Sequence, residues 1–171
     1  SDPSPRKVKN INEQKEEIKN GIKEVYEDNF IEEMKIIMSL LDNYNYIGMD
    51  TEFPGTVYSI SKISKDFYYK SLKLNVESLK LIQLGITLTN EKGEYPSSIP
   101  YHTWQFNFEF DFTKDQYEQS SINLLKSSGI KFNILKSRGI KYKTFTEKFK
   151  SFGLVLNPKI YWISFHGSYD F

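Results

Sequence analysis

Cysteine is absent from all 171 residues of the chain. Its absence excludes a disulfide scaffold, catalysis by a thiolate, and zinc or iron sites that depend on cysteine ligands. A reducing compartment agrees with this composition. Long apolar runs are absent too, since no stretch approaches the roughly 20 consecutive apolar residues of a membrane-spanning helix. The polar segment Ser1 to Lys19 also lacks the apolar centre of a signal peptide. We therefore expect a soluble, intracellular chain without a membrane partner.

The chain has little excess of either charge. Its 23 lysines and arginines nearly cancel its 22 aspartates and glutamates, which leaves a net charge of +1. Overall charge therefore gives no argument for a nucleic-acid partner, and any such site has to come from local chemistry. Hydrophobic residues make up 39% and charged residues 26% of the chain, which is typical of one globular domain of the α/β or α+β type.

The first part of the chain is predicted to be a leader followed by helix. Residues 1–12 hold two prolines, several charges and few apolar residues, which indicates a flexible leader. Glu13 to Glu27 is charged and favours helix. From Asp28 to Leu41 apolar residues recur at helical spacing, so we expect an amphipathic helix there.

The middle of the chain has the pattern of strands. Tyr44 to Phe53 is rich in β-formers and ends in acids before the turn at Pro54 and Gly55. Phe67 to Leu79 predicts a second helix. A strand from Leu81 and another over Thr103 to Phe110, where aromatic and polar residues alternate, predict a β-hairpin with a long loop.

Three more helices and a final strand are predicted after the hairpin. The helices span Gln116 to Ser127, Lys131 to Arg138 and Thr144 to Ser151, and each is followed by a glycine. The strand spans Ile160 to Phe165. This order of elements predicts an α/β fold, with a mixed sheet flanked by helices.

Two carboxylates give the clearest chemical signal. Asp50 and Glu52 are two residues apart on a predicted strand, so their side chains share one face at the strand's end. Like charges about 4 Å apart repel by roughly 1 to 4 kcal/mol, a cost that a bound cation offsets. Alone, this spacing is more often a solvated strand end. The apolar run before the pair and the rigid turn after it favour a metal site.

A third acid is placed similarly near the end of the chain. Asp170 follows the strand Ile160 to Phe165, and its alternative is an ordinary loop position. His166 is interpreted as a structural residue, and His102 as a surface residue of the hairpin loop. The scattered lysines are interpreted as solvated helix faces, because they form no concentrated patch.

Four stretches carry a resemblance to a known family. They are YNYIGMDTEFPG, LKLNVESLKLIQLGITLTNEKGEYP, TWQFNFEF and WISFHGSYDF, and their order and spacing resemble the CAF deadenylase family, the nuclease subunit of the CCR-NOT complex. The resemblance covers nearly all of Tyr44 to Phe171. It implies a ribonuclease H-like fold of the DEDD class and hydrolysis of messenger RNA poly(A) tails from the 3' end.

The resemblance also implies roles for individual residues. Asp50, Glu52 and Asp170 match the family's first three acids, which are ligands of two divalent cations, Mg²⁺ or Mn²⁺. Phe53 would contact the terminal nucleotide. The implied partners are the poly(A) RNA 3' end, the NOT scaffold and a second deadenylase subunit, and the implied location is the cytoplasm and nucleus.

One departure from the family lies at the end of the sequence. The family's fourth aspartate and a histidine base come from helices after the third acid, and the 171 residues include neither. We therefore expect residues 13–171 to form a partial domain truncated at its C-terminal side, with a compromised second metal site and little activity. We also expect self-association through the surface left uncovered.

Two other readings stay open. The chain could be an inert nuclease-fold scaffold in a decay complex. It could also be a DEDD exonuclease acting on other RNA 3' ends or on single-stranded DNA, because paired metals do not select a base.

Overall fold

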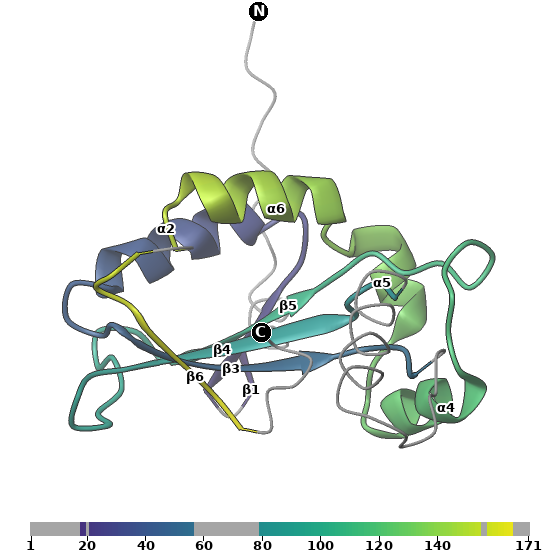
Figure 1. Ribbon diagram of the computed structural model, residues 1–171, viewed down its shortest axis with the longest axis horizontal. Coiled ribbons are helices and arrows are strands. Elements are labelled where there is room, and N and C mark those ends of the chain that lie inside the picture. Colours follow the sequence, from purple (N-terminus) through teal and green to yellow (C-terminus); the bar gives the residue numbers. More distant parts are fainter. Residues whose placement is uncertain (1–17, 20, 57–78, 155–156, 166–171) are drawn as a thin grey trace, which may run out of the picture.

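The computed structural model describes residues 18–19, 21–56, 79–154 and 157–165. Within these residues a mixed sheet is flanked by helices (Figure 1), which confirms the predicted α/β fold. The six described strands are ordered β1-β2-β5-β4-β3-β6. Their bounds are β1 Ile18–Lys19, β2 Ile22–Val25, β3 Tyr46–Glu52, β4 Gln83–Thr89, β5 Thr103–Asn107 and β6 Tyr161–Ser164. The helices are α2 Phe30–Leu40, α4 Gln119–Ser127, α5 Phe132–Arg138 and α6 Tyr142–Ser151.

One face of the sheet carries the main core. Helices α2 and α6 lie over this face (Figure 1), and apolar side chains from alternate strand positions pack beneath them. The fully buried members from the central strands are Ile47, Ile86, Leu88, Trp104 and Phe106. No described helix has the length and apolar character needed to cross a membrane.

The predicted hairpin is confirmed as β4 and β5. The two strands pair antiparallel, from Gln83 with Asn107 to Thr87 with Thr103. The loop between them turns at Asn90, whose side-chain Oδ1 accepts the N–H groups of Lys92 and Glu94. The predicted alternation is also confirmed, because the aromatic side chains at positions 104, 106, 108 and 110 are all buried.

The three predicted helices after the hairpin are present with small shifts at their ends. Gly129 and Gly153 follow α4 and α6 with positive φ angles of 106° and 73°, which is the usual glycine stop of a helix. Gly139 ends α5 for another reason. Its φ is −58°, and a Cβ there would overlap the backbone of Glu109 and Leu135.

The helix-favouring reading of Glu13 to Glu27 is wrong where the structure describes that segment. Residues 18–19 and 22–25 are strands, joined through Gly21 at a φ of 76°. Strand β2 pairs in parallel with β5, and its Val25 is completely buried. Charged residues with good helix propensity form a strand here because pairing with a segment about 80 residues away outweighs the local preference.

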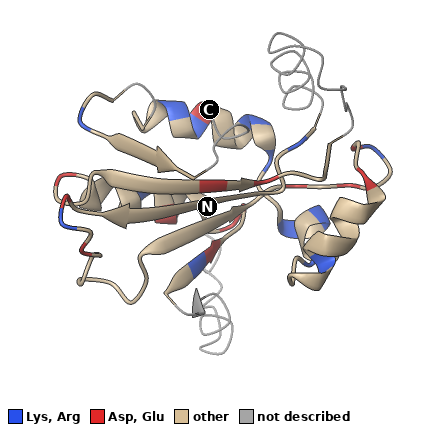
Figure 2. Ribbon diagram, turned by 60° about the horizontal axis from the view of Figure 1, so that its bottom comes forward, with Lys and Arg blue, Asp and Glu red and all other residues tan. Residues whose placement is uncertain are grey.

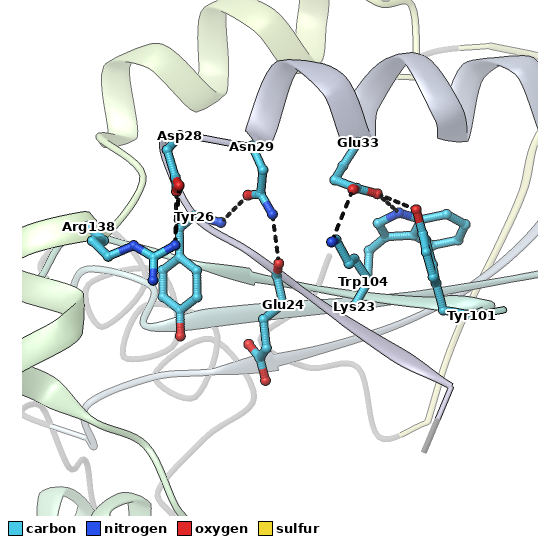
Figure 3. Close-up of polar contacts among 9 residues, drawn as sticks. All are labelled: Lys23, Glu24, Tyr26, Asp28, Asn29, Glu33, Tyr101, Trp104 and Arg138. Carbon is cyan, nitrogen blue, oxygen red and sulfur yellow. Dashed lines mark hydrogen bonds and ion pairs between the residues drawn. The ribbon is translucent and has the colours of Figure 1, made fainter. Parts of the chain in front are cut away.

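A buried carboxylate fixes β2 and β5 beneath α2 (Figure 3). Glu33 of α2 is 4% exposed, and its Oε1 lies 3.6 Å from the Lys23 ammonium. Its Oε2 accepts hydrogen bonds from Trp104 Nε1 at 2.9 Å and from the Tyr101 hydroxyl at 3.0 Å. Burial, together with the neighbouring Glu33 carboxylate, raises the pKa of Tyr101. The acid thus accepts hydrogen bonds from two buried donors and pairs with a buried ammonium.

The segment between β2 and α2 is fixed by Asn29 (Figure 3). Its Oδ1 accepts the Tyr26 N–H at 2.7 Å, and its Nδ2 donates to the Glu24 carbonyl at 3.0 Å. Asp28 pairs with Arg138 at 3.2 Å. The helix predicted from Asp28 therefore begins two residues later, at Phe30.

Residues 1–17 and 57–78, which include the predicted leader and almost all of the predicted helix Phe67 to Leu79, lie outside the described residues.

Replacing Glu33 should be strongly destabilising. In Glu33→Ala the buried Lys23 charge loses the Glu33 carboxylate, and the Tyr101 and Trp104 donors lose their acceptor, so we expect the free energy of unfolding to fall by about 3 kcal/mol or more. Urea denaturation followed by tryptophan fluorescence measures the change. Glu32→Ala, an exposed glutamate one residue earlier, should change stability by no more than about 0.5 kcal/mol. Equal losses in the two variants would contradict the role given to Glu33.

Candidate metal and nuclease site

The paired acids lie at the end of β3, on the face away from the core. Ile47 on the alternate face is buried beneath α2 and α6, whereas Asp50 and Glu52 are exposed. Strand β3 ends at Glu52. The structure therefore places the two carboxylates side by side at a strand end, as the two-residue spacing predicts.

The neighbouring strand leaves room beside the first acid. Asp50 pairs with Gly85 of β4, which has no side chain, and Glu52 pairs with Gln83. Gly48, two residues before Asp50, also lacks a side chain. A cation or a ligand can therefore approach Asp50 from the β4 side without meeting a side chain at position 85.

A line of polar side chains extends from Gln83 across the same face. Its Nε2 donates to Asn107 Oδ1 at 2.7 Å, and Asn107 Nδ2 donates to Glu24 Oε2 at 2.6 Å. Burial raises the pKa of Glu24, although the bond from Asn107 and the nearby Lys131 charge oppose the shift. Sequence reasoning did not identify this line. The signal that could have found it is the amide residue Gln83, which pairs with Glu52 and so lies on the same face of the sheet.

Asp50 affects the ionisation of Glu52. Burial raises the pKa of Glu52, and the neighbouring Asp50 carboxylate raises it further. Both causes disfavour the ionised form of Glu52. The free energy of the metal-free pair is therefore highest when both carboxylates are charged. A divalent cation between them would reverse this balance, since it favours the ionised form of each ligand.

Phe53 follows the pair in a turn that packs against the protein. Its ring is partly buried against the main core, and Pro54 after it is buried. Phe53 directly follows Glu52 in the sequence, and part of its ring is exposed. Its predicted contact with a nucleotide stays a prediction.

The third predicted acid, Asp170, and His166 lie outside the described residues. The described part of β6 runs parallel to β3, and its last pair is Ser164 with Met49. Strand β6 thus ends beside the residue that precedes Asp50. Among the described residues no three histidine, aspartate or glutamate side chains form a metal-binding group.

Charge is dispersed over the rest of the described surface. Figure 2 shows lysines and arginines spread over helices, loops and a strand of the described residues. The expectation for His102 is wrong in part, because its ring is partly buried, stacks on Tyr95 at 4.0 Å and lies 3.1 Å from Thr103 Oγ1.

The donor set fits a hard divalent cation. Asp50 and Glu52 offer only carboxylate oxygens, which Mg²⁺ and Mn²⁺ prefer, and both are exposed enough to accept a hydrated ion. A mixed sheet flanked by helices, with such a pair at the end of a strand that is paired on both sides, is typical of ribonuclease H-like nuclease domains.

The particular family follows from comparison with known proteins. The model of the CAF1 family ribonucleases matches residues 25–154 of the chain. The chain belongs to the CAF1 family of ribonucleases.

Curated relatives support this assignment. Probable CCR4-associated factor 1 homolog 7 of Arabidopsis thaliana is 44% identical over 157 residues, which cover 88% of this chain and 57% of that protein. Poly(A) ribonuclease pop2 of Schizosaccharomyces pombe is 44% identical over 153 residues, covering 88% of this chain and 45% of that protein. The chain thus spans about half the length of these relatives.

Solved structures share the fold. S. pombe Pop2p in its Mg²⁺- and Mn²⁺-bound form superimposes with a TM-score of 0.81 at 43% identity, covering 88% of this chain and 60% of that one. The CAF1 chain co-crystallised with the yeast NOT1 MIF4G domain gives 0.70 at 30% identity, covering 87% and 55%. The predicted ribonuclease H-like fold is confirmed.

Removing the charge of Glu52 should stabilise the metal-free protein. The folded pKa of Glu52 lies above its ordinary 4.5, so the stability that Glu52 contributes is present at low pH and is lost as the pH rises through the folded value. Glu52→Gln stays neutral, and its melting temperature should exceed that of the wild type at about pH 7.5 but not at about pH 4. The gain should be small, about 2 °C or less, because the side chain is exposed.

Melting curves in a chelating buffer at both pH values measure this difference. Glu147→Gln, an exposed glutamate on α6, is the matched control and should show no gain that depends on pH. A melting temperature of Glu52→Gln below that of the wild type at neutral pH would contradict the repulsion between the two acids.

Proposed function

We propose that the protein containing this chain is a metal-dependent 3'-to-5' exoribonuclease that shortens the poly(A) tails of messenger RNA. The observation that carries the proposal is the exposed Asp50 and Glu52 pair at the end of β3. Support comes from membership of the CAF1 family and from the similarity to the poly(A) ribonuclease of S. pombe.

Asp50 and Glu52, together with Asp170, would hold two divalent cations, Mg²⁺ or Mn²⁺. The related S. pombe structure contains both ions. When bound, such a pair supplies an activated water and charge stabilisation for the departing 3' oxygen of a phosphodiester. The part of the protein is to hold the carboxylates in a fixed position, which the backbone pairing of β3 with β4 provides.

Substrate positioning is proposed for Phe53. Aromatic rings bind single-stranded nucleic acid by stacking on bases of any identity. The ring of Phe53 lies next to Glu52 in sequence and is only partly buried. Stacking of the 3'-terminal base on this ring would bring the last phosphodiester toward the acids without itself selecting adenine.

The partners that we propose are those of the family. A solved CAF1 chain was crystallised with the NOT1 MIF4G domain, which supports a NOT scaffold as a partner of this protein. We also propose a second deadenylase subunit as a partner, self-association, and a location in the cytoplasm and nucleus.

Asp50→Ala and Asp50→Asn should weaken Mn²⁺ binding strongly and abolish trimming, because each removes one charged ligand. The natural protein that carries these residues should be used. Calorimetry measures Mn²⁺ binding, and denaturing gels measure trimming of 5'-labelled oligo(A), oligo(U) and oligo(dA). The control is Glu109→Gln, an exposed acid outside β3, which should behave as the wild type.

The outcomes separate the alternative functions. Trimming of oligo(A) that is lost in the Asp50 variants supports the deadenylase. Equal trimming of oligo(U) or oligo(dA) would indicate an exonuclease of broader substrate range. Wild-type protein that binds NOT1 but neither Mn²⁺ nor RNA would favour the inert scaffold.

A further inference from the structure

The turn after the acid pair contacts helix α4 with no space between them. Gly55 has a φ of 123°, and a Cβ at this position would lie 2.5 Å from Glu118 Cβ and 3.0 Å from Ser121 Oγ. Glycine is therefore required here for two reasons, its backbone conformation and the closeness of α4. Helix α4 lies at the end of the sheet toward which β3 runs (Figure 1).

The backbone around Phe53 is held on both sides. The Glu118 N–H donates to the Pro54 carbonyl at 2.9 Å, and the Ile82 N–H donates to the Glu52 carbonyl at 2.8 Å. Phe53 lies between these two anchored carbonyls. A displacement of α4 would consequently be transmitted through Pro54 to Glu52, only two residues away.

Glu118 also fixes the first turn of α4. It is the N-cap residue, and its carboxylate accepts the N–H and hydroxyl groups of both Ser120 and Ser121 at 2.6–3.1 Å. The Ser120 and Ser121 hydroxyls are the main causes that lower the pKa of Glu118 to about 2. The side chain is therefore ionised at neutral pH, and its hydrogen bonds hold together the first turn of α4, which faces Gly55.

A salt bridge anchors the segment that leads into α4. Lys80, two residues before Ile82, lies 2.7 Å from Asp115, whose carboxylate is 5% exposed. Asp115 also accepts the Asp111 N–H at 2.8 Å. The segment before α4 is thus attached near the start of β4, the strand that pairs with β3.

We propose that Glu118 is a positioning residue of the nuclease site: by capping α4 against Pro54 and Gly55, it fixes the turn that orients Glu52 and Phe53. The inference rests on the proposed function, because it assigns Glu118 to the same site. Glu118 is proposed neither as a ligand of the cations nor as a contact of the substrate. It acts through the Pro54 carbonyl and the packing of Gly55.

An ordinary N-cap would predict a different result. A cap that only stabilises α4 would, when removed, lower the melting temperature and leave the site's affinity and catalysis unchanged in the folded fraction. The required control is a variant that weakens α4 without touching the turn. Ile122→Val serves, because it removes one buried methyl group from the same helix.

The test compares Glu118→Ala, Glu118→Asp and Ile122→Val with the wild type in the natural protein that carries this chain. Calorimetry measures the Mn²⁺ dissociation constant, and oligo(A) trimming measures kcat and KM. Glu118→Ala should lower kcat/KM roughly tenfold to hundredfold, the size expected for a misplaced group, and weaken Mn²⁺ binding. Glu118→Asp should recover most of the loss, because aspartate is a preferred N-cap. Ile122→Val should resemble the wild type.

The proposal is overturned if Glu118→Ala and Ile122→Val match each other in both kcat/KM and Mn²⁺ affinity, whatever their melting temperatures. If Glu118→Ala does not fold, Glu118→Gln replaces it, since the amide keeps one acceptor oxygen. Wild-type protein that binds Mn²⁺ but fails to trim would refute the deadenylase function, and Mn²⁺ affinity would then decide the positioning role alone. Absence of Mn²⁺ binding in the wild type would overturn both.

Discussion

The backbone pairing of β3 is the constraint on which the candidate site depends. All seven residues of this strand pair with β4, and four of them also pair with β6. A strand held on both sides has a fixed direction and register, so the alternation of its side chains decides what each face of the sheet contains. One face receives the apolar residues that α2 and α6 cover, and the other receives Asp50 and Glu52.

Two glutamates illustrate opposite uses of the same side chain. Glu33 is buried, but Lys23, Tyr101 and Trp104 satisfy it, so it joins β2, β5 and α2 into one core. Glu52 lies beside another acid, and its pKa is raised first by partial burial and then by the neighbouring Asp50 carboxylate. A pair of this kind costs stability in the metal-free protein, as binding sites commonly do.

Local patterns predicted much of the fold. The alternation over Thr103 to Phe110 predicted a half-buried strand, and the spacing of Asp50 and Glu52 predicted a shared face, because both features depend only on neighbouring residues. Strand β2 was missed, since its stability comes from pairing with β5 and burial of Val25, which no local propensity encodes. Glu118 was missed for the same reason, because its role depends on contact with Gly55. The acid pair by itself favoured a metal site, whereas the number of cations and the role of Asp170 came from the family resemblance, and Asp170 lies outside the described residues.

The alternation of side chains along β3 also favours one register of its pairing with the neighbouring strands. A slip of one residue in its pairing would turn Asp50 and Glu52 toward the helices and expose Ile47 and Met49 to water. Such a molecule would lose apolar burial and bury two unpaired carboxylates at once, and each penalty alone is severe. A chain with β3 in the slipped register would therefore be much less stable than the correctly paired chain. The acids that serve the candidate chemistry also help to specify the register that displays them.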